Sequence, residues 1–239
     1  MIEVLATTPS TNAELIARVS CGDQAQEGDW LLADRQTSGR GRQGREWFDG
    51  LGNFMGSTVV RPGLGDPPAA SLALVIALSL HEVVSARLCP HARPLLKWPN
   101  DLMIGEAKLA GVLLERVDDS VVIGVGVNLA AAPPVEGRAT AACAQFGPPP
   151  DRDLFASDLA ATFCQDLARW RCYGLAPVIA RWQAAAHPLG TLLSVGEPGE
   201  PLLHGAFAGL TDDGALRLTI GDGTVRTIHA GEVRLAVPD

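Results

Sequence analysis

The sequence lacks the cysteine patterns that mark a disulfide-stabilised or zinc-binding protein. Its cysteines are odd in number, widely spaced and contain no C-x-x-C pair; they are Cys21, Cys89, Cys143, Cys164 and Cys172. Neither a disulfide framework nor a zinc site is therefore expected. The five histidines show no ligand spacing either, so we predict no metal held by protein side chains.

Long apolar runs and an excess of positive charge are also missing. The longest apolar segment, 72–80, is far shorter than the ~20 residues of a membrane span and predicts a buried helix. The first residues lack the basic and apolar regions of a signal peptide. The chain of 239 residues has 19 basic and 27 acidic side chains and a formal net charge of −8, which disfavours binding to nucleic acid. We expect a cytoplasmic protein without membrane or nucleic-acid partners.

The remaining composition predicts a globular protein of mixed structure, because 47% of its residues are hydrophobic and can fill a large core. Thr11 and Glu14 have capping-box spacing and predict a short helix after Thr11. Further apolar periodicities favour helices over 67–88, 155–170 and 177–187, and strands over 30–36, 53–60, 94–98, 101–117 (as a hairpin) and 120–129. The Ala- and Pro-rich segment 129–151 shows no clear period and is predicted to be a loop.

The pattern changes after His187. Five short apolar segments separated by turns such as "DDG" and "GDG" follow, and this spacing is typical of a small closed β-barrel. We therefore predict two domains, 1–187 and 188–239.

The stretch "DRQTSGRGRQGREW", residues 34–47, contains the letters of a G-x-G-x-x-G dinucleotide-binding turn. A helix must follow such a turn, but Gly50 and Gly52 interrupt the next segment, which excludes a Rossmann motif. Three arginines alternate with three glycines in this stretch; they are Arg40, Arg42, Arg45, Gly39, Gly41 and Gly44. We interpret the stretch as a loop that becomes ordered around an anion, with a solvated charged face as the alternative.

Strand alternation makes the segment "VVIGVGVNL" a second candidate for ligand binding. Gly124, Gly126 and Asn128 fall on one face. The amide of Asn128 is therefore the only side chain that these three residues place on that face. A flat group such as a purine would fit against it. The alternative is that the glycines only admit a packed helix.

The third candidate is the hairpin that starts at "KWPND". Pro99, Asn100 and Asp101 favour a turn. Lys108 then opens an apolar strand, where alternation puts it on the face of Ala110, Val112 and Leu114 with Gly111 on the other face. A lysine at this place either reaches water or binds an anion. No serine or cysteine nucleophile with a base is evident, so the three segments together point to nucleotide chemistry through positioning and charge.

These segments, "GRGRQGREW", "KWPNDLMIGEAKLAGVLLE" and "GVGVNL", follow "STN" in an order and spacing that resemble the catalytic domain of biotin protein ligases. The last segment, 214–235, is similar to the C-terminal SH3-like barrel of that family. The resemblance implies an α+β fold akin to the class II aminoacyl-tRNA synthetase core, with a mixed sheet and flanking helices. It covers nearly the whole chain.

The resemblance also implies an activity in two steps: biotin and ATP form biotinyl-AMP, and biotin then passes to a lysine of a biotin carboxyl carrier protein domain. Mg²⁺ would arrive on the ATP phosphates. Arg42 and Lys108 would face the reacting carboxylate and α-phosphate. Asp101 would orient or deprotonate the acceptor amine, or only shape its turn. The implied binding residues are Ser10, Thr11, Asn12 and Gln36 for the biotin ureido group, Gly39, Arg40, Gly41 and Gly111 for close loop and strand contacts, and Arg45, Trp47 and Asn128 for the nucleotide.

Two departures and two rival functions accompany this resemblance. The "STN" motif begins at Ser10, so we expect a short form without the winged-helix repressor domain of some family members, and either a monomer or a weak homodimer. The stretch "ATAACAQFG" only loosely matches the family's "ATSL" region.

A lipoate–protein ligase shares the fold but has "GGG" in place of "GRG". A phosphopeptide-binding module built on the terminal barrel is the non-enzymatic alternative.

Overall fold

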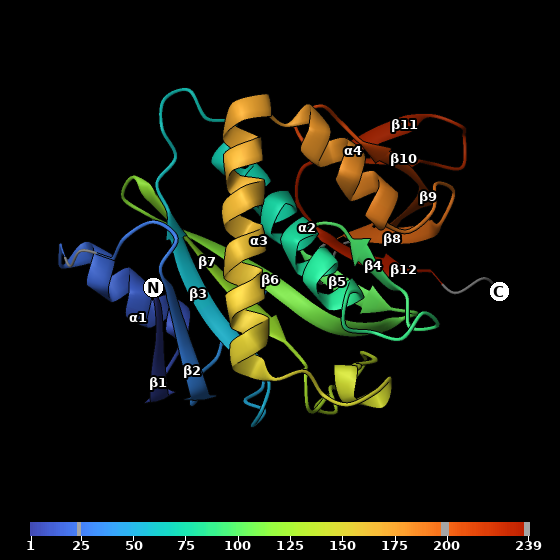
Figure 1. The fold of residues 1–239 in the computed structure, drawn as a ribbon. Helices are drawn as coiled ribbons and strands as arrows, with labels where there is room; N and C mark the ends of the chain where they lie inside the picture. The colour runs from blue at the N-terminus through green and yellow to red at the C-terminus, as the bar shows by residue number, and fades with distance from the viewer. Residues whose placement is uncertain (23–24, 197–200, 237–239) are drawn as a thin grey trace.

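A seven-stranded mixed sheet forms the centre of the computed structural model, which describes residues 1–22, 25–196 and 201–236 (Figure 1). The strand order is β1-β2-β3-β7-β6-β5-β4, in which β1 and β2 are parallel and all other neighbours antiparallel. The strands are β1 (Ile2–Thr8), β2 (Trp30–Gln36), β3 (Phe54–Val60), β4 (Pro94–Lys97), β5 (Asp101–Ile104), β6 (Ala107–Val117) and β7 (Ser120–Val127). The mixed sheet with flanking helices is confirmed.

Helices cover the two faces of this sheet unequally. The helices are α1 (Thr11–Ser20), α2 (Leu72–Ser85), α3 (Arg152–Tyr173) and α4 (Ala176–Ala185). Figure 1 shows α2 and α3 side by side across one face, with α4 leading to the second sheet. On β7, Val121 and Ile123 belong to the large core with these helices, whereas Val122 packs with Leu15 of α1. Because adjacent strand residues point to opposite faces, α1 lies on the face away from α2 and α3.

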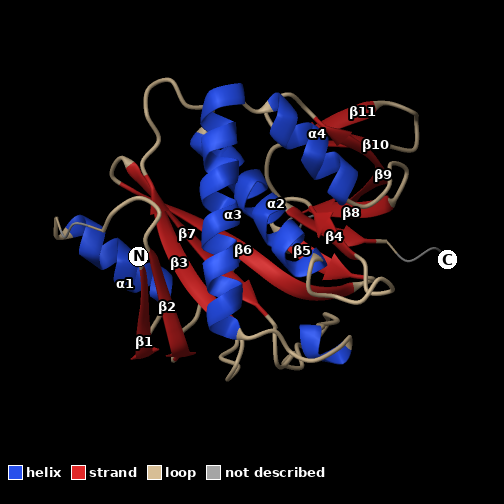
Figure 2. Ribbon diagram, in the orientation of Figure 1, coloured by secondary structure: helices blue, strands red, loops and turns tan. Residues whose placement is uncertain are grey.

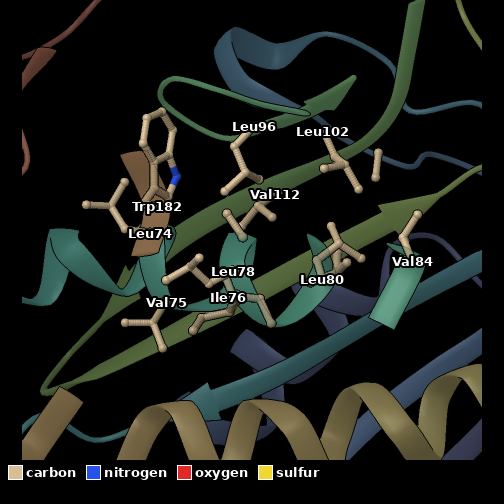
Figure 3. Packing of buried hydrophobic residues seen from close by; sticks show 14 of the residues in the cluster. Leu74, Val75, Ile76, Leu78, Leu80, Val84, Leu96, Leu102, Val112 and Trp182 are labelled. Atoms are coloured by element: carbon tan, nitrogen blue, oxygen red, sulfur yellow. The ribbon is translucent and has the colours of Figure 1, made fainter. Parts of the chain in front are cut away.

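The large core depends on α2, whose side chains are apolar and buried along almost its whole length. Figure 3 shows side chains of α2 meeting Leu96, Leu102 and Val112 of the sheet, with Trp182 of α4 beside them. A helix that is hydrophobic on all sides must be enclosed on all sides. The predicted buried helix is therefore confirmed, and no described helix has both the length and the apolar character that crossing a membrane requires.

Two local details differ from the sequence-based expectation. Helix α1 begins at Thr11 itself, and Ser10 is its N-cap because the Ser10 hydroxyl accepts from the Ala13 amide. Glu14 therefore stands one position too late for a capping box with the true N-cap, and the predicted Thr11–Glu14 box is wrong. Strand β1 was not predicted; its outer residues are largely exposed, since it is an edge strand that pairs only with β2.

The second sheet contains all five predicted short strands. Figure 2 labels β8, β9, β10 and β11 of this sheet. They are β8 (Leu192–Gly196), β9 (Leu203–Leu210), β10 (Leu216–Thr219), β11 (Val225–Ile228) and β12 (Glu232–Leu235), in the antiparallel order β11-β10-β9-β8-β12. Within the described residues no ladder joins β11 to β12, so the hydrogen bonding is that of an open sheet rather than the closed barrel expected. Phe207 and Val233 of this sheet share the large core with Trp182. The boundary at 187/188 remains a prediction.

Candidate active site

A cavity opens on the α1 face of the main sheet, with an empty volume of about 900 Å³ that includes space open to solvent. Several parts of the chain line it: the start of α1, the end of β2, the Arg/Gly loop 40–47, the β4–β5 turn, strands β6 and β7, Arg138 after β7, and the start of β12. A volume of this order suits a small organic ligand or a cofactor. The three segments singled out in the sequence thus meet at one place.

Glycines form the floor of the cavity. Gly126 of β7 pairs with Gly111 of β6, which pairs in turn with Asp101 of β5. A Cβ atom on Gly126 would lie 2.3 Å from the Trp47 ring, and one on Gly124 would lie 2.3 Å from Asn12 Oδ1. The packed-helix interpretation is thus supported at Gly124, and the binding of a flat ligand on this face stays a prediction. Gly124 admits a side chain of α1, and Gly126 leaves a surface on which a flat ring lies, here that of Trp47.

Lys108 reaches the cavity because of an irregularity in the β5–β6 ladder. Leu102 pairs with Ala110 but Met103 pairs with Lys108, so β6 has one extra residue at this point. The bulge reverses the alternation: a Cβ atom on Gly111 would lie 2.8 Å from Lys108 Nζ. Lys108 thus shares a face with Gly111, whereas Val112 lies in the core. The expectation that Lys108 shares the face of Ala110, Val112 and Leu114 is wrong.

Asp101 joins Lys108 to a second lysine at the cavity wall. Its carboxylate lies 2.5 Å from Lys108 Nζ and 3.1 Å from Lys97 Nζ, and all three side chains are mostly buried. Burial disfavours the charge of Asp101, but the two ammonium groups outweigh this effect and lower its pKa to about 2. Burial likewise lowers the pKa of Lys108, and the Asp101 carboxylate opposes that shift. Asp101 is the first residue of β5, and its carboxylate lies between these two cations.

Buried polar side chains form a connected group at the start of α1. Gln36 Oε1 accepts from the Thr11 amide at 2.7 Å and from the Thr11 hydroxyl at 3.2 Å. The Ser57 hydroxyl donates to Asn12 Oδ1 at 2.6 Å, and Asn12 Nδ2 donates to Glu115 at 2.7 Å. These bonds fix the amide of Asn12 above Gly124, at the end of the cavity away from Lys108.

The Arg/Gly loop is held against the rest of the molecule by its arginines. Arg42, which opens a short 3-10 turn over Arg42–Gly44, donates to Asn100 Oδ1 at 3.1 Å and to the Gly231 carbonyl at 3.4 Å. Arg45 donates to Glu232 Oε1 at 2.8 Å. A solvated charged face would make no such contacts, so that alternative does not describe Arg42 and Arg45. Arg40 is exposed and lines the cavity. The ordering of this loop around an anion stays a prediction.

Trp47 connects this loop to the glycine floor. Its ring packs on Gly126, and the Lys108 ammonium lies 5.7 Å from the ring centroid. A cation at this distance from an indole face is attracted by its negative potential. The indole Nε1 is buried and has no hydrogen-bond partner among the described residues. Trp47 is thus a flat aromatic surface next to the buried lysine.

Two family models match this chain. The model of the biotin/lipoate A/B protein ligase family matches residues 4–128, and that of the biotin protein ligase C terminal domain matches residues 194–235. The chain belongs to the biotin/lipoate A/B protein ligase family.

Relatives of this ligase family resemble the chain over nearly its whole length. It is 39% identical to the biotin–[acetyl-CoA-carboxylase] ligase of Paracoccus denitrificans, over 96% of this chain and 98% of the relative. It is 34% identical to the ligase of the same name from Mycobacterium tuberculosis, over 97% and 88%. The structure of the biotin protein ligase from Aquifex aeolicus in complex with biotin and ATP superposes with a TM-score of 0.85 at 26% identity, and 98% of each chain is covered.

Most residues that the ligase resemblance singles out line the cavity. They are Ser10, Thr11, Asn12, Gln36, Arg40, Gly41, Arg42, Arg45, Trp47, Asp101, Lys108 and Gly111. Gly39 and Asn128 are not in the lining. A Cβ atom on Gly39 would lie 2.6 Å from the Trp47 carbonyl oxygen, and Asn128 Nδ2 donates to the Ala141 carbonyl at 3.0 Å. Gly39 thus allows the backbone of Trp47, a lining residue, to come close, and Asn128 is buried outside the lining.

Other residues of the site were not predicted. Lys97 and Asn100 stand in the quoted "KWPND" stretch, and a hairpin with Lys97 opposite Asp101 identifies the lysine as a neighbour of the carboxylate. Ser57 is one of two polar residues, with Thr58, in a strand whose other residues are apolar or glycine, and this is itself a signal. Glu232 and Arg138 carry no local signal, because only the tertiary fold brings them to residues far away in the sequence.

Proposed function

We propose that this ligase activates biotin with ATP as biotinyl-5'-AMP and transfers the biotin to a lysine of a carboxyl carrier domain of a biotin-dependent carboxylase. Its relatives' names and the complex of the Aquifex aeolicus protein with biotin and ATP support this activity. The observation that carries the proposal is that Arg42 and Lys108 line one cavity with the polar group at the start of α1.

The polar group at the start of α1 suits the ureido head of biotin. A ureido group has two N–H donors and one carbonyl acceptor, and Ser10, Thr11, Asn12 and Gln36 offer hydroxyl and amide groups of both kinds. These side chains are already fixed by one another, so little conformational entropy is lost when a ligand binds. The valeryl chain would then run past the Trp47 ring, which covers Gly126, towards Lys108.

The cations at the other end suit the adenylation step. The biotin carboxylate attacks the α-phosphorus of ATP, pyrophosphate leaves, and negative charge accumulates on the α-phosphate oxygens. Arg42 and Lys108 would stabilise that charge, a contribution of roughly 10²–10³ in rate per group by analogy with other preorganised donors. In the second step the acceptor lysine amine attacks the acyl carbon and AMP leaves.

The role of Asp101 in this scheme is to position Lys108. A carboxylate whose pKa is about 2, held between two lysines, is a poor acceptor for the proton of an amine. Its charge instead favours the protonated form of the buried Lys108. We therefore prefer the positioning role over the general-base role that the resemblance left open.

Several finer features complete the proposal. Mg²⁺ enters on the ATP phosphates, since no cluster of three or more His, Cys, Asp or Glu side chains suited to a metal occurs in the described parts of the chain. Arg45 and Trp47, which line the cavity, serve the nucleotide, whereas the amide of Asn128 is held by the Ala141 carbonyl outside the lining. The second sheet is SH3-like. The protein works in the cytoplasm. It acts as a monomer or as a weak homodimer. The net charge of −8 argues against DNA as a partner.

Pyrophosphate exchange tests the proposal. The protein is incubated with Mg·ATP and labelled pyrophosphate, with either biotin or lipoate. Label should enter ATP only with biotin, because adenylation is reversible and needs the acid. Exchange with lipoate alone would identify a lipoate ligase, and no exchange with either acid would leave the phosphopeptide-binding alternative. The transfer step is tested by adding a carrier domain and following its biotinylation. A carrier domain whose acceptor lysine is replaced by arginine is the control and should stay unmodified.

A further inference from the structure

The rim of the cavity has a cation that belongs to none of the ligase motifs. Arg138 comes from the Ala- and Pro-rich segment that follows β7, and its side chain lines the cavity together with Arg42, Arg45 and Lys108. The chain as a whole is acidic. A cluster of cations at one cavity of an acidic protein indicates an anionic ligand there.

The backbone fixes Arg138 next to Lys108. A tight turn closes with the Arg138 amide donating to the Val135 carbonyl at 3.2 Å, and Gly137 within it has a φ of +70°. The chain then runs beside β6: the Lys108 amide donates to the Ala139 carbonyl, and the Ala141 amide donates to the Lys108 carbonyl, both at 2.9 Å. Arg138 is therefore one residue away from a segment that is hydrogen-bonded to the backbone of the buried lysine.

The guanidinium of Arg138 retains most of its hydrogen-bonding capacity. Its one ionic neighbour among the described residues is Glu232, at 3.8 Å, and its side chain is 33% exposed. Glu232 is already engaged by Arg45 at 2.8 Å and has Arg234 at 3.7 Å. One carboxylate among three arginines leaves an excess of positive charge. Lys97, by contrast, has a close partner in Asp101 and donates to the Val233 carbonyl.

We infer that Arg138 binds the β- and γ-phosphates of ATP and the pyrophosphate that leaves. This inference rests on the proposed function: if Arg42 and Lys108 face the α-phosphate, the two distal phosphates need further cations, and Arg138 stands beside Lys108 at the open side of the cavity. A guanidinium fork suits a phosphate better than an ammonium does. In the absence of nucleotide, Glu232 is the counter-anion that the phosphates displace from Arg138.

The electrostatics of the pair agree with this proximity. Burial is the main cause that lowers the pKa of Lys108, and the charge of Arg138 adds to the effect. Two cations that influence each other in this way are both stabilised by a ligand with several negative charges. A triphosphate is such a ligand, whereas biotin has a single carboxylate.

The variant Arg138→Ala tests the inference, with Arg116→Ala as its matched control. Arg116 is an exposed arginine at the far end of β6, so both variants lose one positive charge. In the biotin-dependent exchange reaction, Arg138→Ala should raise the KM for ATP and for pyrophosphate by roughly 10-fold or more, as expected for loss of a charge-assisted hydrogen bond. The KM for biotin and the inhibition constant of AMP, which lacks the distal phosphates, should not change. Arg138→Lys should recover part of the loss.

The outcomes separate this inference from the function on which it rests. Wild-type protein without biotin-dependent exchange contradicts the proposed function itself. Active wild-type protein together with an Arg138→Ala variant whose KM for ATP equals that of Arg116→Ala overturns the role of Arg138. An equal weakening of ATP, AMP and biotin overturns it too, because a merely structural role would disturb all three sites. Thermal unfolding of each variant checks that the fold is intact.

Discussion

The two faces of strand β7 have opposite properties although their residues alternate along one short segment. Val121, Ile123 and Val125 lie in the large core under α2 and α3. The glycines that alternate with these residues face the cavity: Gly124 lies under Asn12, and Gly126 lies under Trp47. One strand thus contributes bulk to the stability of the fold on one face and empty space to the ligand site on the other.

The same division extends across the sheet. On the core face, apolar side chains from α2, α4 and the main sheet pack together (Figure 3), and residues of the second sheet belong to the same cluster. On the cavity face, neighbouring strands contribute Gly111, Asp101 and Lys97 in one row of paired residues. Substitutions on the core face should change mainly the free energy of unfolding, and those on the cavity face mainly the kinetics, except that the buried ion cluster around Asp101 also contributes to stability. Adjacent residues allow this comparison to be tested within one strand.

The largest contrast between a kinetic effect and a stability effect is expected when Lys108 and its neighbour Leu109 are substituted. Lys108→Gln should reduce the adenylation rate by roughly 10²–10³ because a cation facing the α-phosphate is lost. Leu109 is fully buried in the core, so Leu109→Ala should lower the free energy of unfolding by about 2–5 kcal/mol and leave the rate per folded molecule unchanged. Single-turnover kinetics and urea unfolding measure the two effects. The comparison breaks down if Lys108→Gln retains wild-type kinetics.

The next largest contrast between stability and kinetics is expected when Val125 and Gly126 are substituted. Val125→Ala removes two buried methyl groups from the core and should cost about 2 kcal/mol of stability with unchanged KM values. Gly126→Ala puts a methyl group where the Trp47 ring lies, so it should raise the KM for ATP by about 10-fold, equivalent to ~1.4 kcal/mol. Intrinsic Trp fluorescence should report the displaced indole. Unaltered ATP kinetics in a folded Gly126→Ala protein would count against Trp47 as part of the nucleotide site.

The ion cluster on the cavity face should make stability depend on acid pH. The pKa of Asp101 in the folded protein, about 2, is below its ordinary value of 3.8. Its contribution is therefore present above about pH 4 and is lost as the pH falls towards about 2, and the shift corresponds to about 2 kcal/mol. Urea unfolding at several pH values should show this slope in the wild type and a flatter one in Asp101→Asn. Identical slopes in the two proteins would refute the ion cluster as its source.

The smallest effect should come from the contact between the Arg/Gly loop and the second sheet. Arg45 is 38% exposed, so solvent screening limits its pair with Glu232 to a coupling of about 1 kcal/mol or less. A double-mutant cycle with Arg45→Gln and Glu232→Gln, followed by thermal unfolding, measures this coupling. A coupling well above that value would contradict the view that solvent screens this pair.

Most helices and strands could be predicted from the sequence, because their apolar periodicities are strong. Strand β2 and the long helix α3 follow directly from such patterns. Edge strand β1 was missed because its exposed residues do not alternate in polarity. The prediction of the strand face on which Lys108 lies was wrong. Lys108 is placed by a bulge that depends on how β6 pairs with β5, and the sequence of one strand does not specify that pairing.

By itself the sequence determined which residues could be reactive: the arginines among glycines, the "STN" start of a helix, a lysine opening an apolar strand, and two glycines on one strand face. These are local properties, set by residue type and by the period of the backbone. Only the tertiary structure decided that Asp101 holds two lysines, that Trp47 covers Gly126, and that Glu232 and Arg138 join the cavity. Such contacts arise because the sheet packs as a whole, and packing joins residues that the chain keeps far apart.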